Sequence, residues 1–343
     1  MRKMNTPLYI LFLVSVLFVN CRAKTVVIPE NPYAAWSLTD PGLQRRSLNF
    51  PLGEEWDARS HTLDDIRRET LLALNKIDGI SDRPIASDDE AAFVAKLASI
   101  KRSFPDKVNE QFNKYVFAIY FVKNLGGSAV TGIIRYNRDP IGGIIFIDTD
   151  WLGKTANDWA TSKEKTVFSF AEGEDLKVIL EKEENNTVAN ALAFILLHEF
   201  GHIVAAVDNI GPDWSLPKRD YRTFPYFKDF WISEVDSEYD GDIKDRNKIK
   251  FYSKNKIPFG TEGKSLYSDL EDTPFVTLYA ATNADDSFAE AYASYVHVIL
   301  QGKPYEIHAV QGSDEKIIFE NGISRSEGKS QKQFLDKIFG IKD

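Results

Sequence analysis

A run of residues, 188–207, is apolar almost throughout and carries the letters HEFGH at its centre. Its Ala, Leu and Phe content favours a buried helix over a strand. On such a helix the four-residue spacing places His198 and His202 on one face, with Glu199 beside them. A catalytic zinc ion requires this arrangement of two imidazoles and a nearby carboxylate, with one coordination position left for water. The sequence therefore predicts a fold built around a metal-binding helix.

Two other interpretations of this run have to be weighed. A membrane span of this length would place two histidines and a glutamate in lipid at high cost, and no further hydrophobic span follows to enclose them. A core helix could instead satisfy its histidines by ordinary hydrogen bonds. Because the chain has only five histidines, chance would produce His-Glu-x-x-His about once in a few hundred such sequences. The sequence thus favours a metal-binding core helix.

The first 23 residues predict a targeting segment that is removed on export. Arg2 and Lys3 form a basic start, and Leu8 to Val19 is an apolar run too short for a comfortable membrane helix. Cys21, the only cysteine in the chain, follows this run where a bacterial lipoprotein signal places its acylated residue. Residues 21–23 also fit the cleavage site of ordinary secretion. We expect an exported protein that is anchored to the bacterial membrane through lipid on Cys21, in the periplasm or at the cell surface, or is otherwise secreted.

Composition limits the partners and the sources of stability. The chain of 343 residues is 43% hydrophobic, enough for a sizeable core. If Cys21 is acylated, no disulfide remains to contribute, so stability has to come from that core and from bound metal. The net charge of -9 argues against nucleic acid as the main partner and is ordinary for a dissolved protein.

Apolar periodicity predicts an α+β fold with helices before strands. The segment 62–77 is typical of a helix, and Ser87 with Glu90 predicts a capping box for a second helix that ends near residue 104. Short β-type runs follow at 116–122, 132–136, 143–147 and 176–180. We predict a linker and helical region over 24–115, and a catalytic domain with a small mixed sheet over 116–343. One of the four strands is expected to bind extended substrate at its edge.

A long insertion, 209–274, interrupts the predicted catalytic domain. It is dense in aromatic residues, which could form a wall or lid of the substrate cleft or simply pack over the core. Within it, Asp236, Glu238, Asp240 and Gly241 match four positions of a calcium loop. Asn247 stands where such a loop needs a bidentate glutamate, so the match to a calcium site over 236–247 is incomplete.

Zinc bound by two histidines needs a further protein ligand, and three acids are candidates. Asp208 would reach the ion only if the chain turned sharply after His202, and Ala205 stands where a glycine would allow that turn. Asp286 and Glu290 are four residues apart in a second predicted helix, on one face. One of this pair would bind the ion while the other would accept the free N–H of a ligating histidine. A helix cap at Asp286 with a solvated Glu290 is the alternative.

Both motifs together resemble the gluzincin peptidases of the lethal-factor type. The second motif of that family reads Y-x-x-x-N-x-x-E-x-F-A-E-A, and the segment from Tyr279 through Asn283 to Ala291 matches it. Aspartate stands at 286 where the family has glutamate. A side chain shorter by one methylene has to be brought nearer by the backbone, which keeps Glu290 as the alternative ligand. The resemblance covers these two blocks and no more of the chain.

This resemblance implies a zincin-like fold and a zinc peptidase activity with defined roles. It implies that the zinc ligands are His198, His202 and Asp286, that Glu199 is the general base, that Tyr279 stabilises the oxyanion and that Glu290 supports a ligating histidine. Under this hypothesis a zinc-activated water attacks a peptide carbonyl while Glu199 takes its proton.

Two rival hypotheses share the same residues. Iron also binds two histidines and one carboxylate, but such oxygenases set their ligands on strands with other spacings, so a helical His-Glu-x-x-His favours zinc. A membrane-anchored binding protein could keep a degenerate peptidase fold without turnover, with Asp286 as the sign of decay. The intact Glu199 argues against that loss, since a binding protein has no use for the base.

Overall fold

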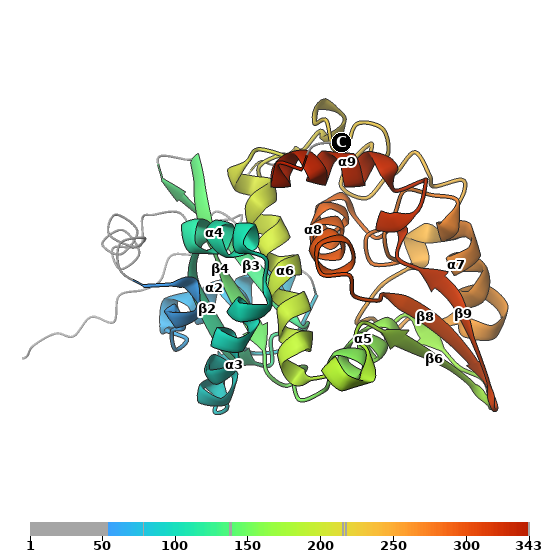
Figure 1. Cartoon of the computed structure of the whole chain (residues 1–343), viewed down its shortest axis with the longest axis horizontal. Coiled ribbons are helices and arrows are strands. Elements are labelled where there is room, and N and C mark those ends of the chain that lie inside the picture. The colour runs from blue at the N-terminus through green and yellow to red at the C-terminus, as the bar shows by residue number, and fades with distance from the viewer. Residues whose placement is uncertain (1–53, 78, 137–138, 215, 217, 342–343) are drawn as a thin grey trace, which may run out of the picture.

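The computed structural model describes residues 54–77, 79–136, 139–214, 216 and 218–341 (Figure 1). Its strands are β1 (Ile85–Ala86), β2 (Val116–Lys123), β3 (Ala129–Tyr136), β4 (Asp139–Asp148), β5 (Phe168–Ser169), β6 (Glu174–Ile179), β7 (Ile257–Pro258), β8 (Glu306–Gln311) and β9 (Asp314–Glu320). Its α-helices are α2 (Asp65–Ile77), α3 (Glu90–Ser103), α4 (Asp106–Tyr115), α5 (Ala156–Glu164), α6 (Val188–Val207), α7 (Lys264–Glu271), α8 (Ala284–Ser294) and α9 (Lys329–Phe339). The protein is therefore α+β, as the sequence predicts.

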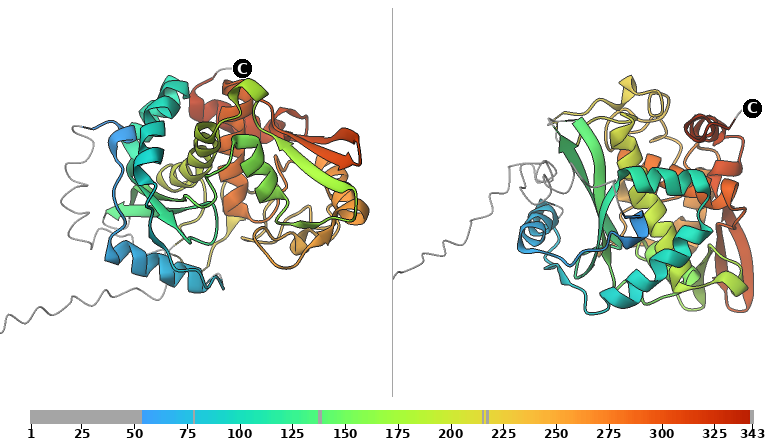
Figure 2. Two further views of the ribbon diagram at one scale, coloured as in Figure 1. Left: turned by 90° about the horizontal axis from the view of Figure 1, so that it is seen from below. Right: turned by 60° about the vertical axis from the view of Figure 1, so that its left-hand side comes forward.

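A four-stranded mixed sheet with the order β1-β2-β4-β3 forms one side of the molecule. β2 runs parallel to β4, and β3 is antiparallel to β4 and lies at the outer edge. The strand β2 is apolar at successive positions because both faces of the sheet are covered: Tyr120 packs with Leu71 and Leu74 of α2, whereas Ile119 and Phe121 face the main core. Figure 2 shows α2 on one side of this sheet and α3, α4 and α6 on the other.

α6 is the central helix and is apolar all round because other elements surround it. β3, β4, α3, α5 and α8 all pack against it, and Phe200 stacks on Phe112 of α4 with ring centroids 4.0 Å apart. Its N-cap is Thr187, whose hydroxyl accepts a hydrogen bond from the Asn190 N–H. Among the described residues α6 is also the one helix long and apolar enough to cross a membrane, but 78% of its most apolar window is buried inside the protein. It is a core helix, as predicted.

The remaining strands lie beyond α6. β6, β8 and β9 form an antiparallel sheet of order β6-β8-β9, with α5 against β6 and α7 against β9 (Figure 1). Of the strand predictions, 116–122, 132–136 and 143–147 fall in the first sheet, whereas 176–180 falls in this second one. Sequence periodicity did not reveal α4, α5, β8 or β9.

The predicted capping box at Ser87 is wrong. The helix α3 begins after Asp89, and no side chain caps its N-terminus. The Ser87 hydroxyl instead pairs with that of Thr149 at 2.8 Å and accepts the Asp89 N–H. The Glu90 carboxylate accepts hydrogen bonds from the hydroxyl groups of Ser60 and Thr62. Tertiary partners have replaced the local cap.

Other expectations from the sequence have different outcomes. The leader, residues 1–23 with Cys21, lies outside the described residues. The domain boundary at residue 116 stays a prediction, although Phe93 and Leu97 of α3 belong to the same core cluster as α6. In the insertion, the aromatics Tyr226 and Phe230 are buried in the core, whereas Phe251 and Tyr252 line a cleft. One part of the insertion therefore packs over the core and another lines a cleft, while its role towards a substrate stays a prediction.

Candidate metal centre and cleft

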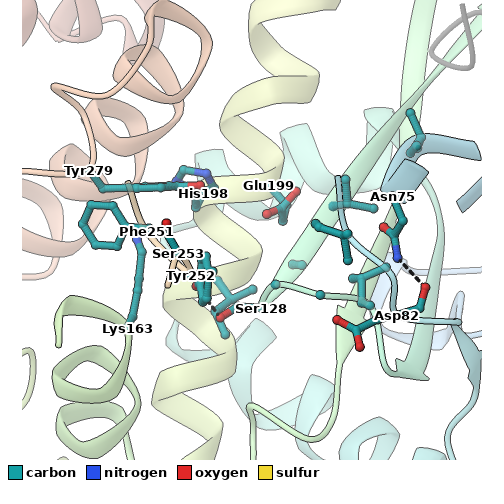
Figure 3. A pocket seen from close by; sticks show the side chains of 18 of the residues that line it. Asn75, Asp82, Ser128, Lys163, His198, Glu199, Phe251, Tyr252, Ser253 and Tyr279 are labelled. Atoms are coloured by element: carbon teal, nitrogen blue, oxygen red, sulfur yellow. Dashed lines mark hydrogen bonds between the residues drawn. The ribbon is translucent and has the colours of Figure 1, made fainter. Parts of the chain in front are cut away.

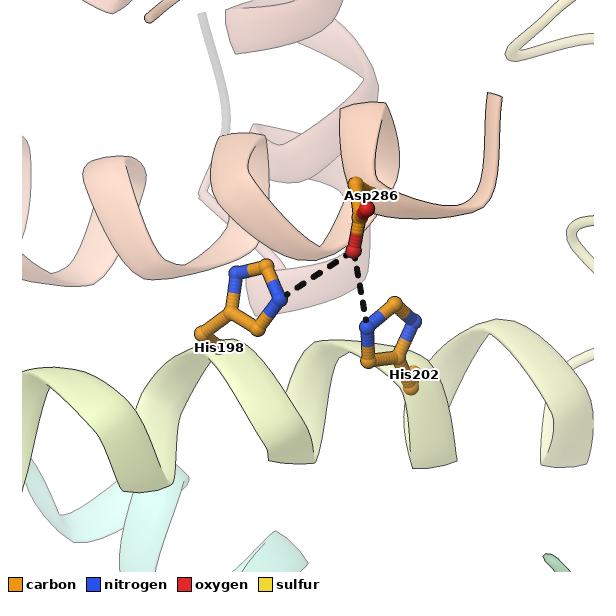
Figure 4. A group of neighbouring side chains, drawn as sticks. All are labelled: His198, His202 and Asp286. Atoms are coloured by element: carbon orange, nitrogen blue, oxygen red, sulfur yellow. Dashed lines mark ion pairs between the residues drawn. The ribbon is translucent and has the colours of Figure 1, made fainter. Parts of the chain in front are cut away.

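Two helices bring the predicted ligands together (Figure 4). His198 and His202 project from one face of α6 towards the first turn of α8, where Asp286 lies. Asn283, the N-cap of α8, accepts the Asp286 N–H through its side-chain oxygen at 2.8 Å and donates its amide to Asp286 Oδ2 at 2.6 Å. Since Oδ2 is held by Asn283, the other oxygen, Oδ1, points at the histidines.

The spacing of the ligand atoms suits a tetrahedral ion. Asp286 Oδ1 lies 3.4 Å from the Nε2 atoms of both His198 and His202. Zinc bonds to nitrogen and oxygen of about 2.0–2.2 Å at tetrahedral angles place neighbouring ligand atoms about 3.3–3.5 Å apart. All three ligand atoms lie within 4.8 Å of one another, and in the described part of the chain this is the one such group of His, Cys, Asp or Glu. The types of donor atom, and the two distances from Asp286 Oδ1 to the histidine nitrogens, fit zinc.

α6 and α8 cross closely at Gly201, beside the candidate ligands. Gly201, the fourth letter of HEFGH, faces the backbone of α8. A Cβ atom at Gly201 would lie 2.7 Å from Ala289 Cα and 3.0 Å from the Ala289 carbonyl oxygen, closer than packed atoms tolerate. Glycine opposite alanine thus lets the two backbones approach. At this helix separation Asp286 Oδ1 lies 3.4 Å from the Nε2 atoms of both histidines.

The Gly201→Ala substitution should therefore weaken metal binding. The added methyl group has to push α8 away, and overpacking of this kind costs about 1–3 kcal/mol. We expect zinc affinity, measured by competition with a chromogenic chelator, to fall about tenfold, since about 1.4 kcal/mol corresponds to that factor. Gly153→Ala is the control, because a Cβ atom there meets nothing within 4 Å. Unchanged affinity in Gly201→Ala would contradict the role of the close crossing.

Glu290 lies on the Nδ1 side of the His198 ring, whereas Asp286 Oδ1 lies on the Nε2 side. Its Oε1 is 3.2 Å from His198 Nδ1, and its Oε2 accepts a hydrogen bond from the Thr277 hydroxyl at 3.1 Å. An imidazole whose Nδ1–H faces a carboxylate presents the lone pair of Nε2 to an ion. Of the two acids that the sequence left as alternatives, Asp286 faces both Nε2 atoms, and Glu290 supports one histidine from the rear.

Charges in the site favour a cation. Burial alone would lower the pKa of His198, but Asp286 and Glu290 raise it to about 9. Burial raises the pKa of Glu290, whereas Lys163 and His198 lower it to about 2. Burial also raises the pKa of Asp286, but the two histidines hold it well below its usual range. Two buried carboxylates that stabilise a proton on His198 would equally stabilise a divalent ion in place of that proton.

Glu199 is held in the cleft by the edge strand. Its Oε2 accepts a hydrogen bond from the Thr131 hydroxyl of β3 at 2.7 Å. The same hydroxyl lies 3.0 Å from the Glu199 backbone oxygen, so α6 and β3 are tied together at this residue. Glu199 lines the cleft together with His198, on the side of the sheet edge.

Tyr279 lies on the opposite wall (Figure 3). Its ring centroid is 5.6 Å from that of His198 and 4.8 Å from that of Phe251, which meets it edge-on. Burial and the surrounding acids, Asp286 first among them, raise the pKa of Tyr279 well above its ordinary value. Its phenol therefore keeps its proton at neutral pH and can donate a hydrogen bond.

A long hollow connects these groups. On one side of His198 and Glu199 a cavity of about 800 Å³ extends between the start of β3, the 250–254 segment and α2. On the other side a smaller cavity of about 350 Å³ continues past Thr131 and His202 to Asp286. The site thus lies along the middle of an extended cleft that follows the edge of the first sheet.

The other sequence candidates do not join the site. Asp208 follows the last residue of α6, which runs to Val207 without the turn a third ligand would need. In the proposed calcium loop, Asp240 forms an ion pair with Arg246, and Asp236 accepts a hydrogen bond from the Ser233 hydroxyl. The metal-binding group of the described residues does not include them.

Three supporting residues were missed by the sequence analysis: Thr131, Lys163 and Thr277. Thr131 on β3 and Lys163 on α5 reach Glu199 and Glu290 from elements distant in sequence, whereas Thr277 lies in the segment just before α8. No motif marks them, so no signal in a single sequence could have identified them.

Comparison with protein-family models, with curated proteins and with solved structures found no match.

Proposed function

We propose that the protein is a zinc-dependent peptidase with a zincin-like catalytic domain. The observation that carries this proposal is the position of Asp286 Oδ1, 3.4 Å from the Nε2 atoms of two histidines on an adjacent helix. Glu199 lies one residue after His198, on the same helix, and faces an open cleft. Two histidines, one carboxylate and a neighbouring base are the residues that metal-assisted hydrolysis uses.

Each residue has a separate chemical task in this proposal. His198, His202 and Asp286 would hold Zn²⁺, which when bound lowers the pKa of a ligated water towards about 7 and polarises a carbonyl. Glu199, steadied by Thr131, accepts the proton of the attacking water and passes it to the leaving amine. The Tyr279 phenol donates a hydrogen bond to the carbonyl oxygen as negative charge develops on it.

The edge strand β3 supports a peptide as the substrate. β3 is the outer strand of its sheet, and its residues Ala129, Val130 and Thr131 line the smaller cavity beside Glu199. An extended chain can add to such an edge by main-chain hydrogen bonds, with its side chains directed alternately to each side. Of the four strands that the sequence left as alternatives for this role, β3 is the one adjoining the catalytic residues.

A direct experiment tests the proposal. The purified protein, loaded with zinc, is incubated with a mixed peptide pool, and new termini are identified by mass spectrometry. We expect about one zinc per chain by elemental analysis, cleavage of internal peptide bonds, and loss of cleavage on addition of a chelator with recovery on restored zinc. A protein that binds no zinc and leaves the pool intact contradicts the proposal.

The rival hypothesis is a binding protein that keeps this fold without turnover. It predicts bound zinc with no cleavage, and a Glu199→Ala variant that behaves like the wild type. The hydrogen bond from Thr131 to Glu199 and the open cleft beside it support the peptidase. Export and a lipid anchor at Cys21 are part of the proposal and rest on the sequence alone.

A further inference from the structure

Lys163 is a buried lysine on α5 at the inner side of the cleft. Only 7% of the residue is exposed, and an ammonium group is costly to bury unless it is paired. Its Nζ atom lies 3.0 Å from Glu290 Oε1, on a residue with no exposed surface. Binding an ion with two histidines and an aspartate does not require a lysine, so the burial of Lys163 needs a separate explanation.

One oxygen atom connects Lys163 to a metal-binding histidine. Glu290 Oε1 lies 3.0 Å from Lys163 Nζ and 3.2 Å from His198 Nδ1. The other oxygen of Glu290 is held by Thr277. Both oxygens of the carboxylate thus have a partner, and Oε1 is the one that faces the Nδ1 side of the His198 ring.

Lys163 also contacts the tyrosine of the site. Its Nζ atom lies 3.8 Å from the centroid of the Tyr279 ring, close enough for a strong cation–π contact. The same ammonium group is 5.8 Å from the ring of Trp159 and 5.7 Å from that of Phe251. Figure 3 shows its side chain reaching towards Phe251 and Tyr279 next to His198.

In a zinc-loaded site His198 is a neutral ligand, so Lys163 is the positively charged partner of Glu290, 3.0 Å from its Oε1 atom. Asp286 and Glu199 have other partners, namely the two histidines and the Thr131 hydroxyl. Without the ammonium group, a buried carboxylate would lack its partner, and such a group moves towards water or another donor. Glu290 would then no longer stay fixed against His198.

We propose that Lys163 is a positioning residue of the site, one that fixes the Glu290 carboxylate against His198 and the ring of Tyr279 beside the cleft. This inference rests on the peptidase function proposed above. The contacts that carry this role are those of Lys163 with Glu290 and with the Tyr279 ring, so its effect is on the geometry of these two groups.

The test compares Lys163→Met with a matched control. Methionine keeps most of the stem and removes the charge. Lys303→Met breaks a comparable pair remote from the cleft, since Lys303 Nζ lies 2.7 Å from Glu181 Oε1, a residue 2% exposed. We expect Lys163→Met to retain about one zinc per chain, with kcat lowered about 10- to 100-fold and KM changed less than about threefold. Lys303→Met should match the wild type in all three.

A spectroscopic measurement that requires no turnover accompanies the kinetics. With Co²⁺ in place of zinc, the visible absorption of Lys163→Met should be shifted from that of the wild type, because a rotated His198 alters the ligand field. The double variant Lys163→Met/Glu290→Gln buries no unpaired charge. Its kcat should lie within about threefold of that of Glu290→Gln alone, because the two side chains act through one oxygen atom.

The possible results separate the two proposals. A wild-type protein that binds no metal and cleaves no peptide contradicts the peptidase function itself. If the wild type does both, a Lys163→Met variant with the wild-type kcat and cobalt spectrum contradicts the role of Lys163 alone. If Lys163→Met does not fold, Lys163→Gln decides, because it also removes the charge but keeps a polar side chain: a lowered kcat with zinc retained and a shifted cobalt spectrum supports the role, and the wild-type kcat and spectrum contradict it.

Discussion

Replacement of Glu199 by glutamine is expected to lower kcat for peptide hydrolysis by about 10²- to 10⁴-fold, the contribution of a positioned general base. The Thr131 hydroxyl donates a hydrogen bond to Glu199 Oε2 at 2.7 Å, and the amide oxygen of glutamine can accept the same bond. The local structure should therefore persist. It has no basic oxygen to take the proton of the attacking water. Zinc content should stay at about one per chain, because Glu199 is not part of the ligand group.

The measurement is the initial rate on one peptide identified from the cleaved pool, with zinc content determined on the same samples. Glu164→Gln is the matched control. Glu164 is also a buried glutamate whose carboxylate accepts a hydrogen bond from a hydroxyl group, that of Tyr267, but it lies on α5. We expect the control to cleave at nearly the wild-type rate. Equal rates in Glu199→Gln and the wild type would rule out the proposed mechanism.

The second large effect concerns the choice between Asp286 and Glu290. Asp286→Asn should lose its zinc on dialysis and with it all hydrolysis. Its charge is removed and its Oδ1 atom, 3.4 Å from both Nε2 atoms, becomes a poor ligand. Glu290→Gln should retain zinc with about 10- to 100-fold weaker affinity, the usual cost of altering a residue that supports a metal-binding histidine.

Zinc affinity measured by chelator competition on both variants separates the two roles. His202→Ala serves as the positive control for the loss of a ligand. Circular dichroism of each variant checks that α6 and α8 still form. Zinc retained in Asp286→Asn but lost in Glu290→Gln would reverse the assignment of the third ligand.

Much of this arrangement could be predicted from local patterns. An apolar run longer than a strand with helix-forming residues marks α6, and the spacing in HEFGH places two imidazoles and a carboxylate on it whatever surrounds it. The four-residue spacing of Asp286 and Glu290 likewise places both acids on one face of α8. The strands β2, β3 and β4 were also recognised, because their apolar runs are short and bounded by turn residues.

Elements with weaker patterns were missed. Every residue of α4 other than Val108, Phe112 and Tyr115 is polar, and α5 is short, so neither shows a clear apolar stripe. At Ser87 a valid local motif was overridden by a tertiary partner, the Thr149 hydroxyl. Predictions from local sequence fail where contacts between distant segments stabilise the fold more than the local contacts do.

By itself the sequence determined which helix carries the paired histidines, which residues are candidate metal ligands and which residue is the candidate base, because all of these follow from spacing along single helices. The tertiary structure alone decided that Asp286 faces the ion position, since that depends on how closely Gly201 lets α8 approach α6. It also decided that Thr131 and Lys163 support the site, through Glu199 and Glu290. Distances between helices are set by packing across the core, which no spacing within one segment encodes.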